Sequence, residues 1–124
     1  RQRQMCIETG IYESLALKYR YAIEQLSAVT GRAFTTLHVL GGGTKDRLLC
    51  QMTADCCGLT VKAGPVEATA LGNIMIQLKA LGLLDSITQG RRLIAETEVI
   101  KTYTPSTQNY AEWNAAYDRF KTLL

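Results

Sequence analysis

Three consecutive glycines, Gly41, Gly42 and Gly43, are the residues of this chain best suited to a chemical role. This glycine triplet follows a short apolar run that ends at Leu40, and it precedes a stretch of helical periodicity. Glycine lets the backbone adopt positive φ and approach a ligand closely, and the N-terminus of the next helix attracts anions. The triplet predicts either a phosphate-binding turn or a strand-to-helix turn that binds nothing, and taken alone it fits both.

Two familiar phosphate loops are excluded by the neighbouring residues. A dinucleotide-binding fingerprint that starts at Gly41 needs glycine at position 46, where Asp46 stands. A Walker A loop ends in Gly-Lys-Ser/Thr, whereas Gly43 is followed by Thr44 and then Lys45. Any nucleotide binding by this turn therefore uses another architecture.

Two carboxylates near predicted helix starts, Asp46 and Glu67, are further candidate site residues. Glu67 follows Gly64-Pro65, and it is explained equally well as a functional group or as an acid favoured by the helix dipole. No metal-ligand spacing, serine elbow or glycosidase-like acid pair is found, so the sequence offers neither a metal site nor a catalytic residue. His38 lies within a predicted strand, and we expect it in the core or at the sheet edge.

Composition and charge narrow the class of protein. The length of 124 residues is that of one domain, and the net charge of +3 comes from scattered basic residues, which argues against nucleic-acid binding. No stretch approaches the roughly 20 apolar residues of a membrane span, and no secretory signal is present. The cysteines form no C-x-x-C pair, so we expect free, mostly buried thiols in a reducing cytoplasm; they are Cys6, Cys50, Cys56 and Cys57.

Hydrophobic periodicity predicts the elements that position the triplet. They are a helix over residues 5–29, a strand over 35–40, a helix over 45–57 with Thr44 as N-cap, and a strand over 59–63. The order strand, helix, strand favours a parallel β-α-β crossover. In parallel sheets, ligands bind at the carboxyl ends of the strands. We therefore expect the triplet and Gly64-Pro65 to share one rim of the sheet.

The second half of the chain is predicted to be mostly helical. The elements are a helix that opens at Gly64-Pro65, a helix from Asp85 or Ser86 to Thr97, an extended connector over 102–105, and a helix over 108–123. Gly72 is expected to pack closely on a backbone or ligand, since glycine within a helix costs about 1 kcal/mol. The expected inward-facing residues are Ile11, Leu15, Tyr19, Ala22, Ile23, Leu26, Val29, Leu48, Leu49, Met52, Cys56, Leu71, Ile74, Leu78, Leu81, Ile87 and Ile94, with an aromatic docking stripe of Tyr110, Trp113, Tyr117 and Phe120.

Three runs of sequence, residues 38–43, 48–55 and 63–73, closely resemble the C-terminal domain of FGGY-type carbohydrate kinases, and the similarity extends over about residues 10–124. The resemblance implies an α/β fold of the ribonuclease H-like, actin-like ATPase type, with short parallel strands and several helices. The triplet matches the family's adenosine motif, with Gly42 as the nucleotide-contact glycine and Gly41 and Gly43 beside it. Where this chain has Asp46, the family often has asparagine.

The resemblance also implies the activity of a parent enzyme. We expect an ATP-dependent, Mg²⁺-requiring kinase acting on L-rhamnulose at the C1 hydroxyl, with fuculose or a ketopentose as alternative sugars. Family members are several times longer, and their catalytic-base aspartate and sugar-binding residues lie upstream of the matched region. Residues 1–124 are therefore expected to be a C-terminal domain fragment, inactive by itself. The alternative is a non-catalytic nucleotide-binding or dimerisation module, paired as a homodimer through surfaces that truncation exposes.

Overall fold

The computed structural model describes residues 2–124, without the side chains of Gln2, Arg3 and Met5. The helices and strands, in chain order, are α1 (Gln2–Thr30), β1 (Thr36–Val39), the 3₁₀ turn η1 (Gly42–Lys45), α2 (Arg47–Cys57), β2 (Thr60–Ala63), α3 (Ala68–Ala80), α4 (Ile87–Thr97), β3 (Lys101–Tyr103) and α5 (Tyr110–Lys121). Among the helices described here, none is both long and apolar enough to cross a membrane.

The sheet has the strand order β1-β2-β3. Strands β1 and β2 are parallel, with Thr36 opposite Thr60, and α2 makes the crossover between them. The predicted parallel β-α-β unit is thus confirmed. Strand β3 pairs antiparallel with β2, placing Tyr103 opposite Val61, in a stretch that the sequence predicted only as an extended connector.

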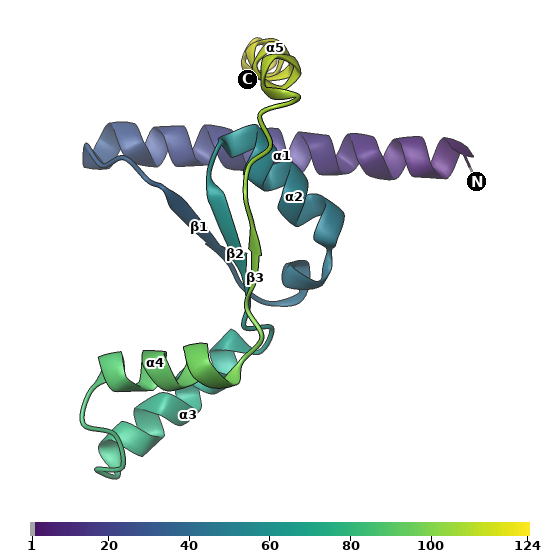
Figure 1. The fold of residues 1–124 in the computed structure, drawn as a ribbon. Coiled ribbons are helices and arrows are strands. Elements are labelled where there is room, and N and C mark those ends of the chain that lie inside the picture. The colour runs from purple at the N-terminus through teal and green to yellow at the C-terminus, as the bar shows by residue number, and fades with distance from the viewer. Residues whose placement is uncertain (1) are drawn as a thin grey trace.

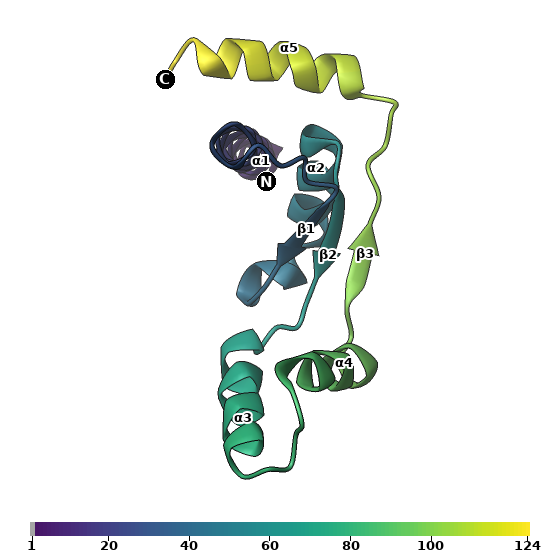
Figure 2. The same ribbon diagram turned by 90° about the vertical axis from the view of Figure 1, so that its left-hand side faces the viewer.

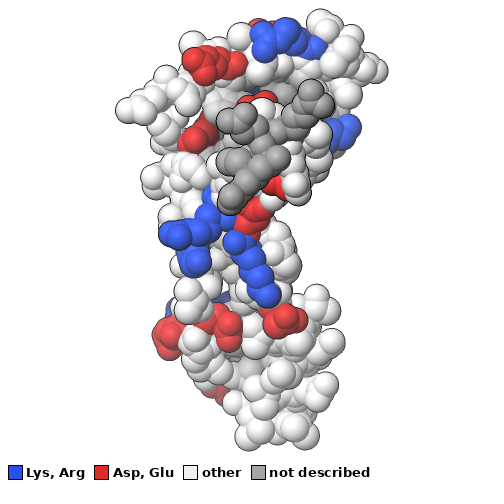
Figure 3. Space-filling model, turned by 90° about the vertical axis from the view of Figure 1, so that its right-hand side faces the viewer, with Lys and Arg blue, Asp and Glu red and all other residues white. Residues whose placement is uncertain are grey.

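The molecule has a helical upper part, a central sheet and a separate helical hairpin (Figure 1). Helix α1 runs across the upper end of the sheet, and α5 lies over α1 and α2 (Figure 2). The hairpin of α3 and α4 hangs below the sheet, beyond the end of β2. On the face in Figure 3, basic side chains gather at mid-height with acidic ones above and below, while the lower lobe is largely uncharged.

Helix α2 contributes to two separate hydrophobic clusters. One joins α1, α2 and α5 and consists of Ala16, Leu17, Cys56 and Tyr117, with Trp113 and Phe120 packed against it. The other joins α2 to the sheet and consists of Cys50, Ala54, Val61 and Ala63, with Leu37, Val39 and Tyr103 at its margin. Helix α2 is therefore the element around which the core is built.

Several predicted inward faces are wrong, and the reason is the limited cover that each helix receives. In α1, Ala16 and Leu17 are buried, whereas Leu26 and Val29 are 55% and 84% exposed, because only the middle of this long helix contacts α2 and α5. Further residues expected inside are exposed: Ile11, Leu15, Tyr19, Ala22, Leu48, Ile74, Leu81 and Ile87. Helix α3 contains no buried residue, since among the helices it packs mainly on α4.

The aromatic face of α5 is largely confirmed. Tyr117 is buried, and Trp113 and Phe120 pack beside it, while Tyr110 is half exposed at the start of the helix. Gly72 does not pack closely on a neighbouring backbone, since a Cβ there would meet no protein atom within 4 Å. Close packing occurs instead at Gly90, where a Cβ would collide with the Met75 side chain.

Candidate functional site

The glycine triplet begins one residue after Leu40, which follows the end of β1, at the rim where the two parallel strands end. Gly41 has a φ of 80°, and its N–H donates to the carbonyl of Pro65 at 3.4 Å. The N–H of Gly64 donates to the carbonyl of Val39 at 2.9 Å. The structure therefore brings the triplet and Gly64-Pro65 together, as the parallel crossover predicted.

A 3₁₀ turn separates the triplet from α2. The carbonyl of Gly41 accepts hydrogen bonds from the backbone N–H of Thr44 at 3.1 Å and from its hydroxyl at 2.7 Å. Thr44 is buried, so its side chain closes the turn from inside. The prediction that Thr44 caps α2 is wrong, because the extra turn moves the start of that helix to Arg47.

Asp46 is the N-cap of α2. Its Oδ1 atom accepts the Leu49 N–H at 3.0 Å. That hydrogen bond and, after it, the interaction with the Tyr12 hydroxyl of α1 lower the pKa of the Asp46 carboxyl. The carboxylate therefore occupies the N-terminus of α2, where we had expected a phosphate to be attracted. In this structure Asp46 stabilises the end of the turn.

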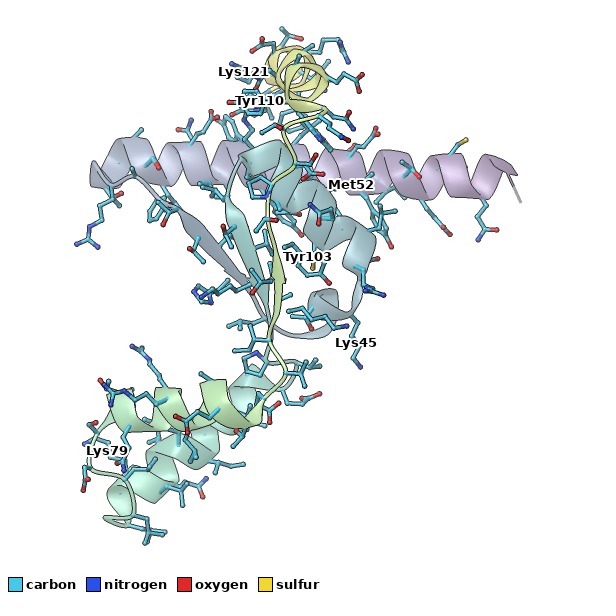
Figure 4. All side chains as sticks on the ribbon, in the orientation of Figure 1. Lys45, Met52, Lys79, Tyr103, Tyr110 and Lys121 are labelled. Atoms are coloured by element: carbon cyan, nitrogen blue, oxygen red, sulfur yellow. The ribbon has the colours of Figure 1, made fainter. Side chains whose placement is uncertain are left out.

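The outer surface of the turn is bare backbone. Gly42 and Gly43 are exposed, and a Cβ added at any residue of the triplet would meet no atom within 4 Å. Within residues 2–124, neither amide makes a backbone hydrogen bond to another element. Lys45 extends from this turn away from the sheet (Figure 4). A ligand can thus approach the main chain closely from the solvent side.

An apolar groove of about 390 Å³ adjoins the turn and reaches Gly43. It lies between α1, α2 and β1, with lining residues that include Tyr19, Ile23, Leu37, Val39 and Leu49. Its floor includes the outer edge of β1, which pairs with no other strand of the described sheet. His38 is exposed at this edge, in agreement with one of the two placements expected for it.

The remaining candidate residues are less involved. Glu67 is exposed and is the N-cap residue of α3, but its side chain makes no capping hydrogen bond. That position is one that the helix dipole favours for an acid. Among the described residues, no three His, Cys, Asp or Glu side chains form a group that could hold a metal ion.

Tyr12 is the residue of this site that sequence reasoning missed. Its hydroxyl interacts with the Asp46 carboxylate beside the triplet, and this interaction raises the pKa of Tyr12. No local signal could have identified it, since the two residues are brought together only by the packing of α1 against α2.

Sequence comparison places this geometry in a known family. The sequence model of the family described as "FGGY family of carbohydrate kinases, C-terminal domain" matches residues 7–81 of this chain. Rhamnulokinase of Bacteroides thetaiotaomicron is 49% identical over 114 residues, which cover 92% of this chain and 23% of that protein.

Two further rhamnulokinases show the same pattern. The enzyme of Enterobacter sp. strain 638 is 42% identical over 88% of this chain and 22% of its own length. That of Klebsiella pneumoniae subsp. pneumoniae is 43% identical over 77% of the chain and 20% of its own length. The chain therefore spans less than a quarter of the relatives it matches. With an actin-like, ribonuclease H-like α/β fold and a matching profile over more than half its residues, the chain belongs to the FGGY family of carbohydrate kinases, as part of the C-terminal domain.

Proposed function

We propose that this chain is the nucleotide-contacting C-terminal part of an ATP-dependent kinase that phosphorylates L-rhamnulose on its C1 hydroxyl. The observation that carries the proposal is the open backbone of Gly41, Gly42 and Gly43 at the ends of parallel strands, with Gly42 and Gly43 exposed. The choice of sugar is supported by the names of the relatives, which are rhamnulokinases. Kinases for fuculose or a ketopentose are the alternatives within the family.

The role assigned to the triplet is to position ATP or ADP. Without side chains, the turn lets the nucleotide lie against the main chain, and the hydrogen bonds inside the turn keep its shape before ligand arrives. Phosphoryl transfer depends mainly on positioning and on charge stabilisation, so a rigid nucleotide cradle contributes to rate. We assign the closest contact to Gly42.

The same geometry limits what this chain supplies. Asp46 is engaged as a helix cap, which makes it a poor catalytic base, and the described residues contain no acid cluster that would hold Mg²⁺. In this proposal the catalytic base, the metal-associated acids and the sugar-binding residues belong to a longer parent chain. We expect residues 1–124 alone to bind nucleotide weakly at best and to show no sugar-dependent ATP turnover, measured with purified protein.

The free edge of β1 and the apolar groove beside it favour one further candidate function. An unpaired strand edge next to apolar surface tends to bind another chain segment. In the first proposal the rest of the kinase covers this surface. In the second, residues 1–124 form a non-catalytic nucleotide-binding module that pairs as a homodimer. Sedimentation of the purified chain and its binding of apolar dyes distinguish the two candidates. A monomer that binds little dye contradicts the homodimer.

The decisive experiment uses the full-length parent kinase, whose place in the cytoplasm is part of the same proposal. Assayed on a panel of sugars, it should phosphorylate L-rhamnulose best, and a preference for fuculose or a ketopentose would overturn the sugar assignment. Gly42→Val should raise KM for ATP roughly tenfold, equivalent to about 1.4 kcal/mol of binding, with KM for the sugar unchanged. Gly10→Ala is the control, because Gly10 also faces open space but belongs to α1 and not to the glycine triplet. An unchanged KM for ATP in Gly42→Val would refute the role of the triplet.

A further inference from the structure

Lys101, the first residue of β3, lies at the same rim of the sheet as the glycine triplet. Because β3 runs antiparallel to β2, Lys101 is opposite Ala63, the last residue of β2. The backbone just before it contacts the next residue along, since a Cβ on Gly64 would lie 2.8 Å from the Val99 carbonyl oxygen. Pro65, which follows Gly64, accepts the N–H of the first glycine of the triplet at 3.4 Å. Strand β3 therefore starts close to the triplet.

The side chain of Lys101 projects from the face of the sheet that α2 covers. Val61 and Ala63 of β2 belong to the hydrophobic cluster between α2 and the sheet. Their partners on β3 are Tyr103 and Lys101, and residues directly opposite each other on paired strands point to the same face. Tyr103 packs at the margin of that cluster, whereas Lys101 is exposed. Lys101 thus carries its charge on the α2 side of the sheet, at the rim.

Cys50 of α2 connects Lys101 with the turn. Its thiol donates a hydrogen bond to the carbonyl of Gly43 at 3.7 Å. Burial and then the charge of Asp46 raise the pKa of this thiol, while the charge of Lys101 lowers it. The Lys101 ammonium and the last glycine of the triplet therefore both lie near one buried side chain.

A nucleotide at the triplet needs positive charge to offset the carboxylate of Asp46. This carboxylate caps the N-terminus of α2, and it repels phosphate groups placed beside it. Lys45 and Arg47 flank Asp46 in the sequence and are exposed, and Lys45 extends away from the sheet (Figure 4). Lys101 comes from another element and lies over the sheet. Within residues 2–124 it forms no ion pair, so its charge is available to a ligand.

We propose that Lys101 is a nucleotide-binding residue whose ammonium group contacts the phosphate oxygens of ATP or ADP held at the triplet. This inference rests on the proposed kinase function and adds a side chain to its backbone contacts. A lysine ammonium binds phosphate as a mobile point charge, which suits a residue that reaches the ligand from a neighbouring strand. Because the contact exists as soon as the nucleotide binds, it acts on nucleotide affinity more than on kcat.

The test compares Lys101→Gln with Lys62→Gln in the full-length parent kinase. Lys62 lies between two buried residues of β2, so its side chain points to the opposite face of the sheet, and it is exposed like Lys101. Lys62→Gln is therefore the matched control, which removes the same charge from a neighbouring strand. It should bind nucleotide as the native protein does.

Lys101→Gln should raise KM for ATP and Kd for ADP roughly tenfold, the effect of losing one hydrogen bond between charged groups. Its Kd for adenosine, its KM for the sugar and its kcat should stay unchanged, because none of these depends on the phosphate contact. Lys101→Arg keeps the positive charge and should recover most of the affinity. The difference between native protein and Lys101→Gln should shrink at high salt, which screens exposed charges.

Unchanged ADP affinity in Lys101→Gln, in a kinase whose KM for ATP rises in Gly42→Val, would overturn this inference and leave the proposed function intact. Equal weakening in both lysine variants would overturn it as well, since general surface charge would then explain the effect. So would a parallel loss of adenosine binding, which indicates a change of structure. A parent kinase that binds neither ATP nor ADP would refute the proposed function itself, and this inference with it.

Discussion

The two ends of α2 differ in how their polar groups are satisfied. At the N-terminal end, the side-chain hydrogen bonds of the turn join residues close in sequence, namely Asp46 with Leu49 and Thr44 with Gly41, and the Gly41 N–H adds one long-range bond to Pro65. At the C-terminal end, the recorded side-chain bonds are long-range, since Arg20 bonds to Asn114 and Tyr117 to Glu24. One end presents open backbone to solvent, and the other joins three helices.

The two ends of α2 therefore serve different purposes, one for ligand binding and the other for stability. A turn whose polar groups are hydrogen-bonded mostly by nearby residues keeps its shape while its outer surface stays free for a ligand. A helix end that is satisfied by distant residues is an anchor, because α1 and α5 each depend on it. Substitutions at the C-terminal end should therefore cost stability, whereas those in the glycine triplet should mainly affect binding.

The largest effect is expected for Arg20→Ala, which breaks the C-terminal anchor. It removes hydrogen bonds to the Cys56 carbonyl, Asn114 and Glu24, and also the contact of the guanidinium with the Tyr117 ring at 4.2 Å. Because hydrogen bonds to charged groups contribute about 1.5–3 kcal/mol, we expect a loss of roughly 2–3 kcal/mol in urea unfolding. Arg32→Ala, at an exposed arginine, is the control and should change little. An equal loss in both variants would remove the distinction between the ends.

The next effect is expected for Tyr117→Phe, which removes the 2.6 Å hydrogen bond to Glu24. The expected loss is about 1 kcal/mol, and it should not add fully to that of Arg20→Ala because both residues share Glu24. Burial and this hydrogen bond raise the pKa of Tyr117 above its unfolded value. The stability advantage of wild type over Tyr117→Phe should thus be complete below about pH 10 and shrink as the pH rises further. A pH-independent difference between the two proteins would contradict this.

At the N-terminal end, Asp46→Ala should cost about 1 kcal/mol, the usual effect of losing an N-cap. Asp46→Asn, which keeps a capping oxygen, should cost less. Since the pKa of Asp46 is lowered in the folded state, the advantage of wild type over Asp46→Ala should be complete above about pH 4 and disappear as the pH falls further. Urea unfolding from pH 2 to 7 measures it, and an advantage that persists at low pH would be evidence against the cap.

The smallest stability effect is expected for Gly42→Ala, since the added methyl group enters open space and φ of Gly42 is not positive. The change should stay within about 0.5 kcal/mol in thermal unfolding. Gly41→Ala is the matched comparison in the same turn, and its φ of 80° should cost about 1–2 kcal/mol. Equal losses in both variants would show that the turn is not open at Gly42.

Much of the fold followed from local pattern, and the errors have a common cause. The glycines, the parallel crossover and the boundary of α2 at Gly58 were predictable because backbone freedom and periodicity are properties of short segments. The buried faces of α1 and α3 were not, since periodicity marks an apolar stripe but does not show what covers it. Val29 is apolar and correctly spaced, yet none of the described elements covers it and it is exposed.

The candidate site divides in the same way. By itself, the sequence determined the family, the glycine triplet and its place after a strand, since all three depend on residue types and their order. Only the tertiary structure decided that the Asp46 cap lies beside Tyr12, that the surface of the triplet is open, and that Arg20 joins the Cys56 carbonyl to Asn114. The physical reason is that these contacts join residues far apart in the sequence, and no local sequence pattern shows which helices will pack together.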